Sequence, residues 1–111
     1  MLDILPEVKQ HLEYLLPVYS EKTEQPVSTP CISYFLYNDN QQETGDTIIY
    51  SSITVCIKVW DHNIGNMMAN TLSVDEIMRL NGYKRVSVNT MSDDGLYCNV
   101  LLFRGLGKEF I

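Results

Sequence analysis

The stretch SSITVCIKVW, residues 51–60, alternates regularly between two kinds of side chain. One parity is apolar and β-branched, with Ile53, Val55, Ile57 and Val59. The other parity holds Thr54, Cys56, Lys58 and Trp60. Because successive side chains of a β-strand point to opposite faces of a sheet, this pattern predicts a strand with one face buried in a core. The second face, with its lysine and tryptophan, requires a different environment.

Two segments show the spacing of amphipathic helices. Apolar residues three and four positions apart predict a helix over residues 4–16, with Asp3 as its cap. A second stripe of this kind predicts either one bent helix or two abutting helices over residues 63–81, beginning at Asp61 or Asn63. Both helices have one apolar side, so each is expected to cover part of a sheet.

Aromatic and β-branched runs bounded by turn residues predict three further strands, at residues 31–38, 83–91 and 96–104. Val86 and Val88 are expected to point inward. The resulting order, helix, strand, strand, helix, strand, strand, predicts an α+β fold. We expect a mainly antiparallel four-stranded sheet with the helices packed on one face. Residues 1–104 would form this single domain, and residues 105–111 a short C-terminal tail.

Two helices cover only one face of such a sheet, so the other face should be open. We expect Lys58, Trp60, Tyr97, Leu101 and Phe103 on it. A monomer rarely leaves a large apolar patch in water. Either the chain covers this face itself, with residues 18–30 or the C-terminal tail, or a second protein chain does.

Composition limits the classes of function. The chain has 14 acidic and 8 basic residues, a net charge of -6, and no cluster of Lys and Arg in the sequence. A nucleic-acid-binding protein normally has a basic face, so direct binding of DNA or RNA is not expected. Cys31, Cys56 and Cys98 lie far apart in apolar runs, which indicates free buried thiols and no metal site. No stretch is long and apolar enough for a membrane span, and the N-terminus has no signal-peptide pattern.

The polar side chains do not form a recognisable catalytic group. His11 lies among polar neighbours on the first helix, and Asp93-Asp94 precedes Gly95 in a turn. Asp61 and His62 are adjacent at the start of the second helix, where capping and surface roles are more common than acid–base chemistry. We therefore expect a binding or assembly protein that is not an enzyme and has no cofactor. An enzyme that uses Asp61 and His62 is the least favoured alternative.

The order and spacing of several short motifs resemble the tail terminator, or tail completion, proteins of long-tailed bacteriophages. The resemblance covers about residues 4 to 104 and includes Pro30-Cys31-Ile32, Val59-Trp60-Asp61, the segment RLNGY and Phe103-Arg104. It implies a structural virion protein of the neck, assembled in the host bacterial cytoplasm. Such a protein forms a homo-oligomeric, hexameric ring that caps the tail tube, stops its polymerisation and joins it to the head-side connector. DNA would pass through the lumen without specific binding, since an acidic wall repels phosphates.

In such a ring, the open sheet face would contact the neighbouring subunit, and Phe110 and Ile111 would dock into a partner. The polar segment between the first two strands is expected to be a loop that contacts the tube or a neighbour. It comprises Asn38, Asp39, Asn40, Gln41, Gln42, Glu43, Thr44, Gly45 and Asp46. A small monomeric or dimeric regulatory domain that binds a ligand or another protein is the main alternative.

Overall fold

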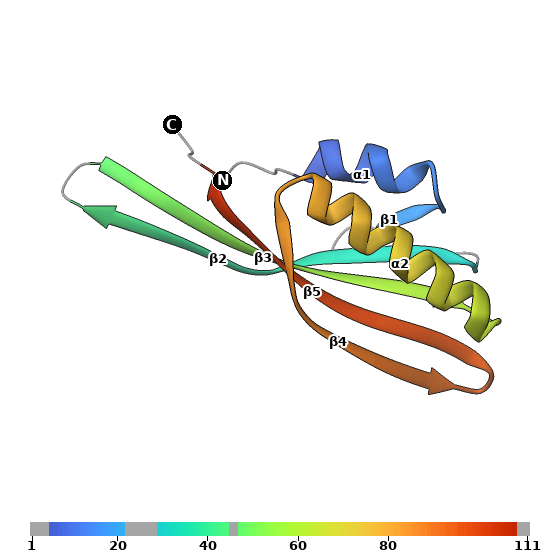
Figure 1. Cartoon of the computed structure of the whole chain (residues 1–111). Coiled ribbons are helices and arrows are strands. Elements are labelled where there is room, and N and C mark those ends of the chain that lie inside the picture. Colours follow the sequence, from blue (N-terminus) through green and yellow to red (C-terminus); the bar gives the residue numbers. More distant parts are fainter. Residues whose placement is uncertain (1–4, 22–28, 45–46, 109–111) are drawn as a thin grey trace.

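The computed structural model describes residues 5–21, 29–44 and 47–108 of the 111-residue chain (Figure 1). Two helices and five strands follow one another in this part. They are α1 (Leu5–Glu13), β1 (Val18–Ser20), β2 (Cys31–Thr44), β3 (Thr47–Asp61), α2 (Ile64–Leu80), β4 (Tyr83–Asp93) and β5 (Leu96–Lys108).

The strands form one mixed sheet in the order β1-β2-β3-β5-β4. Strand β1 runs parallel to β2, with Val18 opposite Ile32, and the other three pairings are antiparallel. The prediction of a four-stranded antiparallel sheet is therefore wrong, and the element order is α-β-β-β-α-β-β. The strand that was not predicted, β1, has three residues, which are too few to show a periodic pattern in the sequence. Its pairing depends on β2, as the bond from the Ile32 amide to the Pro17 carbonyl (2.8 Å) shows.

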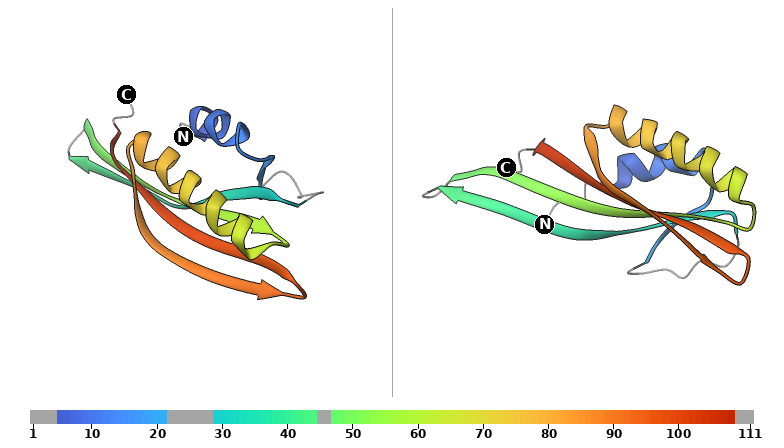
Figure 2. Two further views of the ribbon diagram at one scale, coloured as in Figure 1. Left: turned by 45° about the vertical axis from the view of Figure 1, so that its right-hand side comes forward. Right: turned by 60° about the horizontal axis from the view of Figure 1, so that its bottom comes forward.

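Both helices lie on one side of the sheet (Figure 2). The alternation in β3 has the predicted consequence, because Val55, Ile57 and Val59 are fully buried beneath the helices. Ile32 of β2 and Leu12 of α1 belong to the same core. At about 25 cal/mol per Å² of apolar surface, each such side chain contributes roughly 1.5–3 kcal/mol.

Helix α2 is one continuous helix. Asn63 is its N-cap, and its side chain accepts a hydrogen bond from the Asn66 amide at 2.9 Å, as one of the two predicted starts requires. The buried side of the helix is formed by Met67, Thr71, Val74 and Met78. Gly82 follows the helix with φ +88°, a conformation that glycine adopts without a steric penalty.

The polar segment that was predicted to be a loop is mostly strand. Residues 38–44 continue β2 and pair with β3, with Asp39 opposite Ile53 and Glu43 opposite Ile48. Residues 45–46 lie outside the described part. We call residues 38–44 of β2 and 47–52 of β3 the arm. The arm extends beyond the layer of helices (Figure 1) and gives the molecule a length of 52 Å against a width of 24 Å.

The β4–β5 hairpin contains a bulge that changes which side chains face the helices. Arg85 is opposite Phe103, whereas Ser87 is opposite Leu102, so one extra residue of β4 lies between these pairs. Val86 and Val88 were predicted to point inward, but both are exposed. Val88, which is opposite Leu101, does lie on the face of the helices, whereas Val86 is the extra residue of the bulge. Strand β5 continues to Lys108, so residues 105–108 of the expected tail are strand. Phe110 and Ile111 lie outside the described residues.

Candidate functional site

The face of the sheet away from the helices carries a chain of polar contacts centred on Lys58. The Lys58 ammonium lies 3.1 Å from a carboxylate oxygen of Glu21 and 5.4 Å from the centre of the Phe35 ring. The side chains of Lys58 and Glu21 are 25% and 26% exposed. A partly buried ion pair of this kind, supported by an aromatic ring, holds the lysine against the sheet.

Trp60 belongs to the same chain of contacts. Its indole Nε1 donates to the hydroxyl of the buried Ser33 at 3.0 Å, and that hydroxyl donates to Glu21 at 3.0 Å. The polar groups of Lys58 and Trp60 thus have partners within the chain. Ser33 and Glu21 were not singled out from the sequence. Glu21 is one of several charged residues in a polar stretch, and no spacing distinguishes it.

The three cysteines lie on this face as well. Cys31 and Cys98 are the cross-strand neighbours of Trp60 on either side, and Cys56 is opposite Phe35. All three are free and buried, as predicted. Burial raises the pKa of each thiol, that of Cys98 to about 12. The thiols are therefore protonated at neutral pH and are poor nucleophiles.

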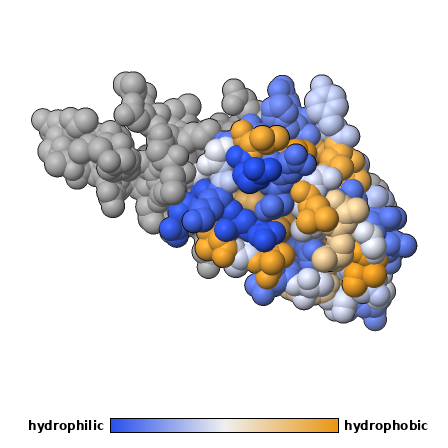
Figure 3. All heavy atoms as spheres, in the orientation of Figure 1, coloured by the Kyte–Doolittle hydropathy of each residue, from blue (hydrophilic) through white to orange (hydrophobic). Residues whose placement is uncertain are grey.

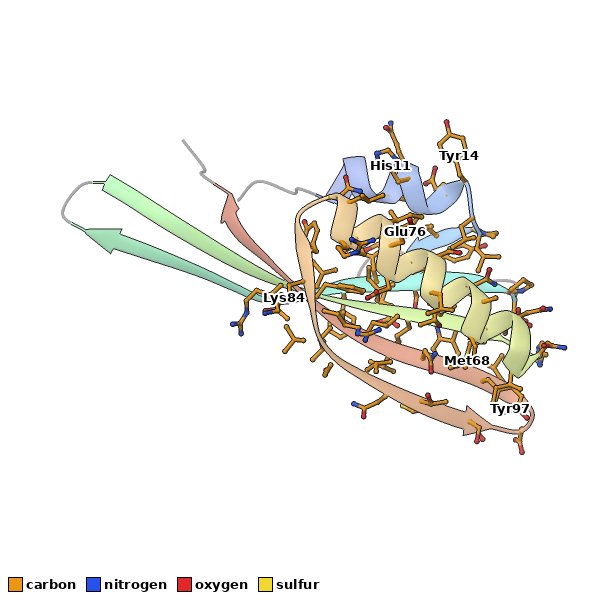
Figure 4. The ribbon with its side chains drawn as sticks, in the orientation of Figure 1. His11, Tyr14, Met68, Glu76, Lys84 and Tyr97 are labelled. Carbon is orange, nitrogen blue, oxygen red and sulfur yellow. The ribbon has the colours of Figure 1, made fainter. Side chains whose placement is uncertain are left out.

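Two residues that were expected on the open face belong to the core. Leu101 and Phe103 are 0% exposed, and their cross-strand partners on β3 are Ile57 and Val55. Directly opposite residues share a face, so β5 directs this parity toward the helices. Tyr97 also packs against the core (Figure 4). The predicted positions of these three residues on the open face are wrong.

The exposed apolar surface lies along α2 and β4. Leu72 is 69% exposed and Leu80 is 73% exposed. The other large apolar side chains exposed on these two elements are Ile64, Met68, Val86, Val88 and Met91. The Asp75–Arg85 ion pair (3.5 Å) joins the two elements. We call Ile64, Met68, Leu72 and Val88 the α2–β4 flank. Figure 3 shows hydrophobic residues over these elements.

Both sides of the sheet end in strand edges that bond to no other strand within the described residues. Strand β4 is the last strand on one side. On the other side, β1 pairs with β2 only up to Tyr34, so the outer edge of the arm has no neighbouring strand there. Unpaired backbone groups of this kind are available for pairing with another chain.

The residues at the start of α2 have a structural explanation. A carboxylate oxygen of Asp61 accepts a hydrogen bond from the Asn63 amide at 2.8 Å, which supports the cap of the helix. His62 is exposed to solvent. Among residues 5–21, 29–44 and 47–108, no three His, Cys, Asp or Glu side chains gather as metal ligands would. No helix in that part is both long and apolar enough to cross a membrane.

Comparisons with known proteins identify the fold. No family model matches the sequence, and no curated protein matches it. A solved structure does match. It is a chain in the virion of a native gene transfer agent particle, with a TM-score of 0.63 and 13% identity. The match covers 89% of this chain and 90% of the other, so the two share a fold over nearly their whole length.

Proposed function

We propose that this protein is a structural component of a phage-like virion. The observation that carries this proposal is the shared fold with a chain of a gene transfer agent virion, which includes nearly all of both chains. Folds alone do not determine function, so the surfaces of this chain must also suit assembly.

Two surfaces support an assembly role. The α2–β4 flank exposes four apolar side chains beside an edge strand. Several large apolar side chains exposed on two neighbouring elements are consistent with a protein–protein interface. The arm extends beyond the layer of helices, as an element that contacts another subunit would.

Within the virion, we propose that the chain forms a six-membered ring at the neck. The ring would cap the tail tube, stop its polymerisation and join it to the head-side connector. Free edges at opposite sides of one sheet suit a head-to-tail contact, and such contacts close into rings when the rotation between subunits permits. The net charge of -6 per chain favours passage of DNA through the lumen without binding, because like charges repel.

The length of tail tubes tests this function. Particles assembled without this chain should carry tubes of irregular and excessive length, and supplying the chain should restore a uniform length in electron micrographs. Uniform tubes in its absence would contradict the ring-capping role. A monomeric or dimeric chain that carries a bound small molecule in native mass spectrometry would instead support the regulatory alternative.

A further inference from the structure

Two basic residues lie side by side on the face of the sheet away from the helices. Lys84 of β4 is directly opposite Arg104 of β5. The neighbours of Lys84 in sequence face the helices, because Tyr83 is in the core and Arg85 pairs with Asp75 of α2. Since side chains alternate along a strand, Lys84 points to the other face, and Arg104, next to the buried Phe103, does the same.

Repulsion between the positive charges of Lys84 and Arg104 destabilises the sheet. The Cβ atoms of directly opposite residues are about 5 Å apart, and like charges at that spacing destabilise a sheet. Both side chains are exposed, and neither makes an ion pair with the described part of the chain. An acidic partner from outside the chain would remove the repulsion.

The pair stands out in a chain with few basic residues. Lys84 and Arg104 are two of the eight lysines and arginines of this acidic chain. Arg79 and Arg85 are close to Lys84 in sequence, but Arg79 lies in α2 and Arg85 pairs with Asp75 on the side of the helices. Figure 4 shows Lys84 where the arm leaves the body of the molecule, and Figure 3 shows strongly hydrophilic residues gathered there.

The arm has the complementary charge. Residues 38–44 include Asp39 and Glu43 and no lysine or arginine. At about 3.3 Å per residue, this segment is about 23 Å long. That length is similar to the 24 Å width of the molecule, so an arm can reach across a neighbouring copy. In its own chain, the arm extends away from Lys84 (Figure 4).

We propose that the Lys84–Arg104 pair of one copy binds the acidic arm of a second copy. This inference rests on the proposed ring and specifies one of its contacts. The arm and the pair are different surfaces of the chain, so a contact between them in two copies is head-to-tail. Because it is ionic and near the surface, raising the salt concentration should weaken it.

Other occupants of the pair are conceivable from charge alone. The exposed β4–β5 turn carries Asp93 and Asp94, and DNA carries phosphates. The arm is favoured over the turn because it has both the reach and an unpaired strand edge. The arm of a second copy is favoured over DNA because the chain as a whole is acidic and would repel a duplex.

Charge reversal on the full chain tests the contact. The reversed-pair variant is Lys84→Glu/Arg104→Glu, and the reversed-arm variant is Asp39→Lys/Glu43→Lys. Alone, each variant sets like charges against each other in every contact, so self-association in sedimentation velocity should weaken by at least about tenfold. In an equal mixture, each arm meets a pair of opposite charge, and assembly should return to near the wild-type level in an alternating arrangement.

A matched control removes the effect of net charge. The reversed-turn variant, Asp93→Lys/Asp94→Lys, has the same net charge as the reversed-arm variant, but its pair and its arm are unchanged. It should therefore assemble alone as the wild-type chain does, and a fluorescently labelled reversed-pair variant mixed with it should not enter its rings. Entry of the reversed-pair variant into the rings of the turn variant, loss of assembly in the turn variant alone, or no loss of assembly in the reversed-pair variant would overturn the proposal. So would loss of binding to a fluorescent DNA duplex in the reversed-pair variant while assembly is unchanged.

The same experiment separates the contact from the proposed function. Each sample is run alone and with the tail tube protein of the same particle. If the wild-type chain and the reversed-pair variant both form rings, the contact is refuted and the ring role stands. If the wild-type chain stays monomeric in both conditions, the ring role and the contact are both refuted.

Discussion

The buried amide of Asn99 should couple α2 to the sheet through Thr71. Asn99 is 1% exposed and lies on β5 beneath the helix. Its Nδ2 donates to the Thr71 hydroxyl at 2.9 Å, and that hydroxyl donates to the Met67 carbonyl at 2.8 Å. Two nearly isosteric substitutions, Thr71→Val and Asn99→Leu, remove opposite ends of this contact.

The two substitutions should lower the free energy of unfolding by different amounts. Thr71→Val leaves the Nδ2 donor of Asn99 with only the Met68 sulfur at 3.4 Å, a weak acceptor, so a buried donor is nearly unpaired. We expect a loss of about 1–3 kcal/mol in the free energy of unfolding. Asn99→Leu leaves the Thr71 hydroxyl bonded to Met67 and removes the acceptor of the Thr90 hydroxyl (2.6 Å), which is on an exposed residue and can bond to water, so a loss of about 1 kcal/mol is expected. The double variant should cost less than the sum, with a coupling of about 1–2 kcal/mol.

Urea unfolding of the wild-type chain, the two single variants and the double variant measures this coupling. The comparison requires that the slope of the free energy of unfolding against urea concentration is the same in all four proteins. Ser73→Ala is a suitable control, because its hydroxyl donates to the Ala69 carbonyl (3.3 Å) on the exposed side of the same helix. That variant should change the stability by no more than about 0.5 kcal/mol. Additive costs for Thr71→Val and Asn99→Leu, to within about 0.3 kcal/mol, would refute the coupling.

Three further predictions concern packing, pH and assembly. Gly105→Ala should cost about 1–3 kcal/mol in urea unfolding, because a Cβ there would lie 2.9 Å from the Tyr83 ring; an unchanged midpoint would refute this. The raised pKa of Cys98 means that the unfolded chain loses its thiol proton near pH 9 while the folded chain keeps it to about pH 12. Cys98 should thus contribute about 1.4 kcal/mol to the fall in stability between pH 8 and pH 10, and the total fall should be smaller by that amount in Cys98→Ala; equal slopes would refute it. Leu72→Lys should reduce self-association in sedimentation velocity without lowering the stability of the monomer, since Leu72 is 69% exposed; unchanged association would exclude the α2–β4 flank as an interface.

The sequence predicted the features that depend on local chemistry. The alternation of Val55, Ile57 and Val59 identified the buried face of β3, because periodicity in side-chain polarity directly reflects burial. Asn63 was one of two predicted caps of α2, and its side chain makes the capping bond. The three cysteines were predicted to be buried free thiols, and they are.

The wrong predictions concern residues whose orientation is set by the pairing of their strand with a neighbouring strand. Strand β5 is apolar on both parities, so the sequence does not show which of its faces meets the helices. Only its register with β3, Ile57 opposite Leu101, assigns Leu101 and Phe103 to the core. The bulge after Arg85 likewise shifts the parity of β4, and a bulge has no reliable sequence signal.

The candidate site was affected in the same way. Lys58 and Trp60 do lie on the face away from the helices, but Ser33 and Glu21 bond to them. Those partners come from the β1–β2 region, whose parallel pairing spans too few residues to be predicted. The exposed apolar residues are on α2 and β4 instead, where their spacing in the sequence resembled that of a core.

Native mass spectrometry of the full chain, alone and with the tail tube protein of its particle, tests the central claim most directly. A closed ring predicts a species with six times the mass of the chain in at least one of these samples, and this species should dissociate as salt is raised. Monomers alone in both samples, at every concentration, would contradict the account.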